Sequence, residues 1–321
     1  MDCIRRWYTS RVKGIPAPGR PSEPAVFRGT WKSFYQQDEL SEITCPGCNS
    51  RAFEDIANEF GIAISRCSTC RLVYTRTPLP DSQAHYLVDT DQYLAKYSAV
   101  FRGEISHPRD RNYDEQLRLL ERFLRRGDLL DIGSHCGFFL RRARQRGWRT
   151  TGVEPSPVSA CLAREQFGLD VRTGSLEEAN LPSSSFDVVT LIDVFEHVGN
   201  PNPLLAEVAR VLRPGGLVFV KVPNVRYVLA KHHLLRRVPG AVPDVFNARE
   251  HVVHYSRHTL AQMLENSDFL LIAYAVPLPI QTGGPVRRFV RSAGPFVARL
   301  LPRGPDLPLA TDVVAIARKR A

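Results

Sequence analysis

The chain has 321 residues, of which 43% are hydrophobic and 24% are charged. These values are ordinary for a globular protein and exclude a wholly disordered, collagen-like or coiled-coil chain. The length suits one large domain, or a core with one small appendage. No apolar run approaches the roughly 18 residues of a transmembrane helix, and the N-terminal segment does not have the pattern of a signal peptide.

The net charge of +10 is compatible with nucleic acid, an anionic membrane surface or acidic substrates as partners. Arginine is spread along the chain without a dense basic arm, so nucleic-acid binding is the less favoured interpretation. Two stretches, Tyr227–Phe246 and Pro285–Arg303, mix apolar and basic residues. Each is predicted to be a helix packed on the core or a substrate lid, with peripheral membrane contact as a weaker alternative.

The first third of the chain divides into three parts. Residues 1–40 are rich in Pro, Gly and Arg and are predicted to be a tail, whereas residues 41–77 contain two cysteine pairs. Residues 78–118 carry weak helical signals and are predicted to be a helical linker or lid. An amphipathic helix is predicted from Leu117 to Gly127, where the glycine ends it.

From residue 128 onward, strand patterns alternate with helix patterns, and residues 225–258 are predicted to be an insertion. Repeated units of this length predict an α/β fold, with a parallel sheet covered by helices on both faces. Strands are predicted over 128–132, 150–154, near 171, and over 187–192, 217–222, 269–276 and 311–317, and helices over 137–146, 158–167, 203–212 and 256–266.

The cysteine pairs Cys45, Cys48 and Cys67, Cys70 form a C-x2-C-x18-C-x2-C pattern. Each pair makes a tight turn that points two thiolates at one metal, and the spacing fits a tetrahedral zinc site. Four protein ligands leave no open coordination position, so this zinc is predicted to be structural. The other three cysteines are scattered, which is not a disulfide framework and predicts a reducing, cytoplasmic compartment.

A glycine turn follows the predicted strand 128–132. Gly133 and Gly137 allow the backbone to approach a ligand closely, and Glu154 ends the next strand, where its carboxylate can accept two hydrogen bonds from a ribose. Asp131 directly precedes the turn. Its charge would repel the diphosphate of NAD but is compatible with the ammonium and sulfonium groups of S-adenosylmethionine. An NAD-dependent dehydrogenase is therefore the enzyme alternative, and a zinc-ribbon nucleic-acid-binding module is the non-enzymatic one.

These motifs resemble those of class I S-adenosylmethionine-dependent methyltransferases. Asp131–Gly137 resembles their D-x-G-x-G-x-G motif, Glu154-Pro155 their ribose acid, Phe186–His197 their fourth strand with its following loop, and Leu212–Gly216 the turn before the fifth strand. The resemblance covers roughly residues 119–321. It implies a Rossmann-like methyltransferase sheet that is mostly parallel with an antiparallel last strand. The cysteine segment resembles the small zinc ribbon that precedes this domain in some of these enzymes.

The resemblance also implies a set of cofactor-binding positions. His135 stands where the motif has its middle glycine, and Ser175 stands where relatives often carry an aspartate near the adenine. The predicted cofactor-binding residues are Asp131, Gly133, Ser134, His135, Gly137, Phe138, Glu154, Pro155, Ser175, Leu176, Asp193 and Val194.

Two histidines are candidates for the acceptor side of the site. His197 follows the predicted fourth strand, where an imidazole could take the acceptor's proton, although packing against the next helix is an equal alternative. His251, near His254, is the second candidate, with a structural role also open. Methyl transfer needs little beyond in-line positioning of the sulfonium, so a base is not strictly required. We predict transfer to an oxygen, with carbon second, of a small molecule such as a sugar or natural-product intermediate.

Overall fold

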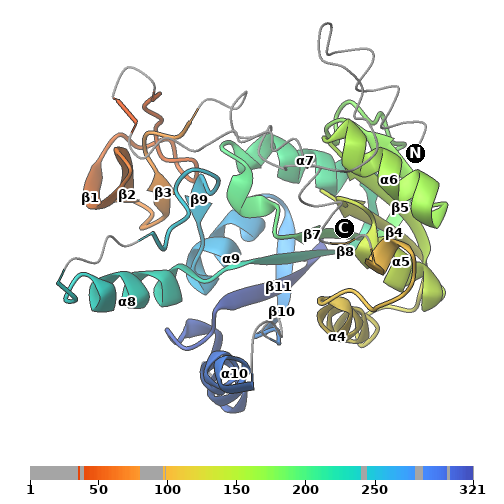
Figure 1. The fold of residues 1–321 in the computed structure, drawn as a ribbon. Coiled ribbons are helices and arrows are strands. Elements are labelled where there is room, and N and C mark those ends of the chain that lie inside the picture. The colour runs from red at the N-terminus through yellow and green to blue at the C-terminus, as the bar shows by residue number, and fades with distance from the viewer. Residues whose placement is uncertain are drawn as a thin grey trace, which may run out of the picture.

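The computed structural model describes residues 35–36, 40–79, 97, 99–239, 244–278, 285–301 and 304–320. Most of the predicted tail and residues 80–96 of the predicted lid therefore lie outside the described residues. The described residues form one large sheet and one small sheet (Figure 1).

The large sheet has seven strands in the order β10-β11-β8-β7-β4-β5-β6. Strands β8, β7, β4, β5 and β6 pair in parallel, and β11 is antiparallel to both of its neighbours. The α/β Rossmann-like fold and the antiparallel last strand are thus confirmed. The strand bounds are β4 Asp128–Ile132, β5 Arg149–Glu154, β6 Asp170–Thr173, β7 Phe186–Ile192, β8 Leu212–Pro223, β10 Phe269–Ala275 and β11 Asp312–Lys319.

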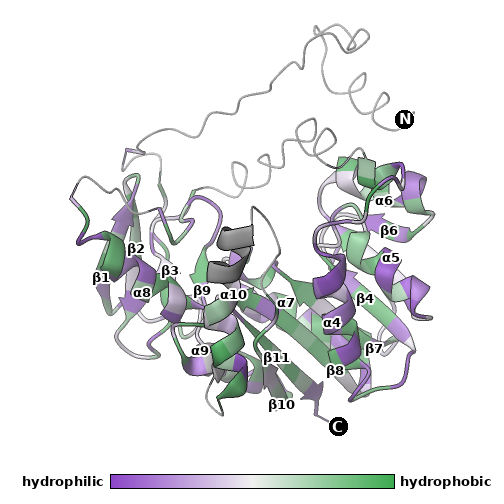
Figure 2. Cartoon of the chain, turned by 60° about the horizontal axis from the view of Figure 1, so that its bottom comes forward, coloured by the Kyte–Doolittle hydropathy of each residue, from purple (hydrophilic) through white to green (hydrophobic). Residues whose placement is uncertain are grey.

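Helices cover both faces of this sheet because successive strand residues point to opposite sides. In β7, Val188 packs with α4, α5 and α6, whereas Val189 packs with α7 and α9. Figure 2 shows the central strands as hydrophobic, which agrees with burial on both faces. The helix bounds are α4 Asp110–Leu120, α5 Phe138–Gln145, α6 Pro157–Phe167, α7 Pro201–Val211 and α9 Arg257–Glu265.

Two elements, α4 and β8, have bounds that differ from those predicted. Helix α4 begins at Asp110 rather than Leu117 and ends at Leu120, because its first turns bury polar residues such as Asn112 and Gln116 that conceal the helical period. Strand β8 begins at Leu212 and runs through the Pro-Gly-Gly segment that was predicted to be a turn. Pairing of Leu212 with Phe186, and a hydrogen bond from Lys319 Nζ to the Leu212 carbonyl at 2.9 Å, hold this extension in place.

Both stretches of mixed apolar and basic residues contain a helix. Helix α8, Val225–Leu235, occupies the predicted insertion, and α10, Pro285–Leu300, lies near the C-terminus. In α10, Ala298 is fully buried but Phe296 and Leu300 are exposed. Among the described helices, none is long and apolar enough to cross a membrane.

The small sheet joins the cysteine segment to the methyltransferase-like part of the chain. Its order is β1-β2-β3-β9, all antiparallel, with β1 Phe53–Glu59, β2 Ile62–Cys67, β3 Val73–Thr75 and β9 Val253–His254. Strand β9 comes from the end of the predicted insertion, and Tyr74 pairs with Val253. Cys45, Cys67 and Tyr74 also belong to the core that packs under α7 and α9. The ribbon is consequently built into the larger fold.

Candidate active site

The turn between β4 and α5 requires glycine at two positions. Gly133 has a φ of +67°, and a Cβ there would lie 2.4 Å from Cγ2 of Val194. Gly137, the N-cap of α5, has a φ of +78°, and a Cβ there would lie 2.4 Å from Leu169. His135, at the position of the motif's middle glycine, adopts a left-handed φ of +49°. The turn therefore retains its tight conformation despite this departure from the motif.

Glu154 at the end of β5 binds this turn from the side. Its side chain is buried, and its two oxygens accept the backbone N–H groups of His135 at 2.8 Å and Ser156 at 2.9 Å. Burial raises the pKa of Glu154, while the two N–H groups act in the opposite direction. Each carboxylate oxygen has a second lone pair, so the group can still accept hydrogen bonds from a diol such as a ribose.

Asp131 lies near the start of the turn, and its buried carboxyl group contacts one hydroxyl group. Thr190 donates a hydrogen bond to it at 2.6 Å, and burial together with the negative charge of Glu154 raises the pKa of Asp131 to about 7. The hydroxyl of Ser134 is buried and has no hydrogen-bond partner in the part of the chain that the structure describes. A buried acid without a counter-charge and an unpaired hydroxyl fit the ammonium and carboxylate of a bound amino acid, as in S-adenosylmethionine.

The other predicted cofactor-binding residues near the turn differ in how far they are buried. Ser175 closes a turn after β6 with Glu178, donating its backbone N–H to the carboxylate at 2.8 Å. Leu176 is buried in the core, as is Phe138 at the start of α5, and Pro155 is exposed beside Glu154. These positions surround the glycine turn along the carboxyl ends of β4, β5 and β6, the usual ligand edge of an open parallel sheet.

Asp193 is the centre of a partly buried charge network in which Lys221 is the buried member. It has a φ of +57° and forms ion pairs with Lys221 and with Arg109, the latter at 2.8 Å. Lys221 also contacts Asp312 at 2.9 Å. Burial raises the pKa of Asp193, but the charges of Lys221 and Arg109 outweigh it and hold that pKa below its ordinary value. Sequence analysis missed Arg109, Lys221 and Asp312, although a lysine inside the apolar run 217–222 was a usable signal.

The structure brings His197 and His251 together. His197 ends the short helix η2, Phe195–His197, and its ring lies edge-on to that of His251 with the centroids 4.9 Å apart. Nδ1 of His197 lies 3.0 Å from the Glu250 carbonyl, which can only accept a hydrogen bond. Nδ1 therefore carries the proton, and in the neutral ring Nε2 has a free lone pair.

Glu196, which sequence analysis did not single out, completes a cluster with these histidines. One ligand atom from each of Glu196, His197 and His251 lies within 4.8 Å of the others. Glu196 is 2% exposed, and its Oε2 has no hydrogen-bond partner among the described residues. The Val252 N–H donates to the Glu196 carbonyl at 2.8 Å, which joins η2 to the segment that carries His251.

Thr75 connects this cluster to the small sheet. Its hydroxyl donates to the His251 carbonyl at 2.7 Å and lies 3.2 Å from Nε2 of His254. Because the single hydroxyl proton is already used, Nε2 of His254 must be the donor in the second bond. Burial lowers the pKa of His254 to about 3, so the ring is neutral and its one proton is on Nε2. This arrangement gives His254 a structural role.

The four predicted metal ligands converge. Sγ of Cys45 lies 3.4 Å from that of Cys70, and Sγ of Cys48 lies 3.6 Å from that of Cys67. These separations exceed the roughly 2.05 Å of a disulfide. Zinc–sulfur bonds of about 2.3 Å in a tetrahedron place the sulfurs about 3.8 Å apart, so the arrangement fits zinc closely. All four sulfurs lie within 4.8 Å of one another.

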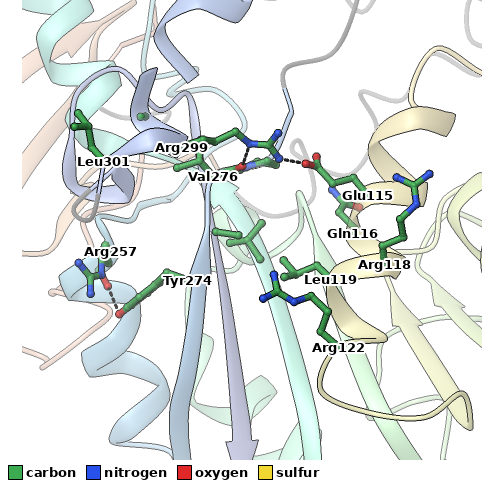
Figure 3. Close-up of a pocket in the computed structure, with 14 residues that line it drawn as sticks. Glu115, Gln116, Arg118, Leu119, Arg122, Arg257, Tyr274, Val276, Arg299 and Leu301 are labelled. Atoms are coloured by element: carbon green, nitrogen blue, oxygen red, sulfur yellow. Dashed lines mark hydrogen bonds and ion pairs between the residues drawn. The ribbon is translucent and has the colours of Figure 1, made fainter. Parts of the chain in front are cut away.

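A cavity of about 720 Å³ lies elsewhere, between α4, β10 and α10 (Figure 3). Arg299 donates to the Val276 carbonyl at 2.8 Å and pairs with Glu115, while Tyr274 donates to the Arg257 carbonyl at 3.1 Å. None of the predicted site residues lines this cavity. Its position therefore does not identify the active site.

The comparisons with known proteins identify the family. Residues 105–274 match the methyltransferase domain family, and the chain belongs to that family. A chain in the complex between the Haloferax volcanii Trm112 methyltransferase activator and a methyltransferase has a TM-score of 0.50, with 15% identity over 72% of this chain and 97% of that chain. At this identity the likeness shows the fold alone, which is that of class I S-adenosylmethionine-dependent methyltransferases.

Two curated relatives are ubiquinone biosynthesis O-methyltransferases. The protein from Aeromonas salmonicida is 30% identical over 129 residues, which is 36% of this chain and 54% of the relative. The protein from Caulobacter vibrioides is 34% identical over 129 residues, which is 36% of this chain and 51% of the relative. The chain thus spans about half the length of these relatives. The family match favours the methyltransferase prediction over the dehydrogenase alternative.

Proposed function

We propose that the chain transfers a methyl group from S-adenosylmethionine to an oxygen of a small-molecule acceptor. The observation that carries this proposal is the buried pair of carboxylates at the glycine turn, Glu154 and Asp131, within a methyltransferase-family fold. Relatives named as O-methyltransferases favour oxygen over carbon as the acceptor atom.

Each carboxylate has a separate role in this proposal. Glu154 accepts the ribose hydroxyls, while Asp131 and Ser134 face the methionine end of the cofactor. Gly133 and Gly137 let the backbone approach the ligand, and His135 and Phe138 complete the turn. Ser175 and Leu176 lie beside the adenine, and Asp193 and Val194 cover the cofactor. When bound, S-adenosylmethionine supplies an electrophilic methyl group on a positively charged sulfur.

The acceptor approaches from the side of His197 and His251. Its oxygen forms a bond to the methyl carbon as the carbon–sulfur bond breaks, and the sulfonium becomes a neutral thioether. The hydroxyl proton must leave in the same process, and Nε2 of His197 has the lone pair to receive it.

The four cysteines hold a structural zinc ion in this proposal. Zinc binding would stabilise a segment too short to fold on its own core alone, and it would hold β3, with Thr75, against the His251 segment. Elemental analysis should give one zinc per chain with wild-type cysteines and none in Cys45→Ser/Cys67→Ser. Zinc-free wild-type protein with four freely titratable thiols would contradict the assignment.

Two measurements test the catalytic proposal. Isothermal titration calorimetry should show binding of S-adenosylmethionine and of S-adenosylhomocysteine, but not of NAD. Incubation with deuteromethyl-labelled S-adenosylmethionine and fractionated small-molecule extract should then yield products heavier by one labelled methyl group, in amounts that match the S-adenosylhomocysteine formed. Binding of NAD in place of S-adenosylmethionine would overturn the proposal.

A further inference from the structure

We propose that Glu196, His197 and His251 form a second metal site, which binds a divalent cation with open coordination positions at the acceptor side of the methyltransferase. The existence of the site stands on its own geometry. Its role in activating the acceptor rests on the function proposed above.

The three side chains come from two segments that the backbone holds together. Glu196 and His197 lie in η2, His251 lies just before β9, and their ligand atoms are within 4.8 Å of one another. Metal–ligand distances of about 2.0–2.2 Å place such donors about 3.0–3.5 Å apart. His197 is exposed, so a modest rotation of its ring can close the site around an ion.

One oxygen of the Glu196 carboxyl group is left without a partner within the described ranges. Glu196 is 2% exposed, and the oxygen concerned is Oε2. The neighbouring cations do not supply this partner, because Lys221 contacts Asp193 and Asp312, and Arg109 contacts Asp193. A buried carboxylate oxygen that has neither a hydrogen bond nor an ion pair is costly. A bound cation would provide both the charge and the bond.

The ring of His197 is arranged as a metal ligand requires, and the backbone of His251 is fixed beside it. A ligating imidazole normally donates its other N–H to a carbonyl or carboxylate, which fixes the tautomer and the ring orientation. His197 has this arrangement, because Nδ1 donates to the Glu250 carbonyl at 3.0 Å and leaves Nε2 free. The backbone carbonyl of His251 is fixed by Thr75 at 2.7 Å.

The donor set distinguishes this site from the cysteine site. Four thiolates form a closed zinc site, whereas two imidazoles and one carboxylate suit Mn²⁺, Fe²⁺, Co²⁺ or Zn²⁺ and leave positions for water or substrate. An acceptor hydroxyl bound at an open position would lose its proton to solvent more readily, because the cation lowers its pKa. Its oxygen would then attack the methyl carbon, and His197 would be a ligand rather than the base.

The experiment is a titration with Mn²⁺ of the whole chain, purified with zinc in its cysteine site. Electron paramagnetic resonance measures how much Mn²⁺ is bound. Mn²⁺ binds thiolates poorly, so it reports on the second site. We expect one Mn²⁺ per chain, with affinity at least tenfold weaker in Glu196→Gln and in His251→Ala. The matched control is His258→Ala, an exposed histidine of α9, which should bind Mn²⁺ as the wild type does.

Thermal unfolding of the proteins without Mn²⁺ shows whether a variant that binds Mn²⁺ weakly is still folded. Glu196→Gln replaces a buried carboxyl group by an amide of the same shape, so its melting temperature should equal or exceed that of the wild type while its Mn²⁺ affinity falls. A structural role for Glu196 would instead lower the melting temperature, and this result together with unchanged Mn²⁺ affinity would overturn the proposal.

Calorimetry with S-adenosylmethionine on the same samples separates the two proposals. If the wild type binds the cofactor and methylates its acceptor in EDTA with no Mn²⁺ bound, the role of the metal in activating the acceptor is refuted and the transferase stands; absence of Mn²⁺ binding in the titration refutes the site itself. If Mn²⁺ binds at Glu196 but the cofactor does not bind, the transferase is refuted and the metal site stands.

Discussion

Replacing Glu154 with alanine should weaken binding of S-adenosylmethionine by about 10- to 100-fold. The carboxylate is placed to accept two ribose hydroxyls, and each charge-assisted hydrogen bond is worth roughly 1.5–3 kcal/mol before water compensates. A net loss of about 1.4–2.8 kcal/mol corresponds to that range of dissociation constants. The variant should also unfold more easily, because the N–H groups of His135 and Ser156 lose their acceptor.

Isothermal titration calorimetry with S-adenosylmethionine and S-adenosylhomocysteine measures the first effect, and urea unfolding without ligand measures the second. Both ligands contain the ribose, so both affinities should fall by the same factor. Glu177→Ala, which replaces an exposed acid in the turn after β6, is the control and should change neither quantity. A folded Glu154→Ala protein with wild-type affinity would refute the assignment of the ribose to this carboxylate.

Three further predictions concern the turn, the buried acid and the small sheet. Gly133→Ala should lower the free energy of unfolding by about 1–3 kcal/mol and reduce cofactor affinity, because the new Cβ would lie 2.4 Å from Val194. The control is Gly103→Ala, where φ is also positive but the new Cβ meets no atom within 4 Å. The pKa of Asp131 is raised from 3.8 to about 7, so between these pH values the native state binds a proton that the unfolded state has lost. The free energy of unfolding, measured with urea, should therefore fall as the pH rises from about 4 to about 7, and Asp131→Asn should flatten this slope. Thr75→Val removes the hydrogen bonds to the His251 carbonyl and to His254, so it should lower the free energy of unfolding by about 1–3 kcal/mol. It should also reduce kcat more than cofactor affinity, because His251 loses the contact that fixes its backbone. Equal effects on kcat and on cofactor affinity would contradict a link between Thr75 and the acceptor side.

The sequence alone determined the features that depend on neighbouring residues. The strand, glycine turn and helix around Gly133 are predicted by the local hydrophobic period and by the backbone freedom of glycine. Glu154 is predicted to lie beside this turn because it ends the next strand along the chain. The cysteine pairs were equally readable, since each CxxC turn already directs two thiolates to one point. All these signals lie within about 25 residues of chain, so few conformations could separate them.

Only the tertiary structure decided which distant side chains meet. Arg109 and Asp193 are 84 residues apart, and Thr75 and His254 are 179 apart, yet each pair is in contact. The order of strands in the large sheet brings Lys221 beside Asp193, and the pairing of β3 with β9 brings the cysteine segment against the segment that carries His251. Neither order is encoded in a local period, because strand pairing is selected by the burial of both sheet faces at once. The charge network and the Glu196 cluster therefore exist only in the folded chain.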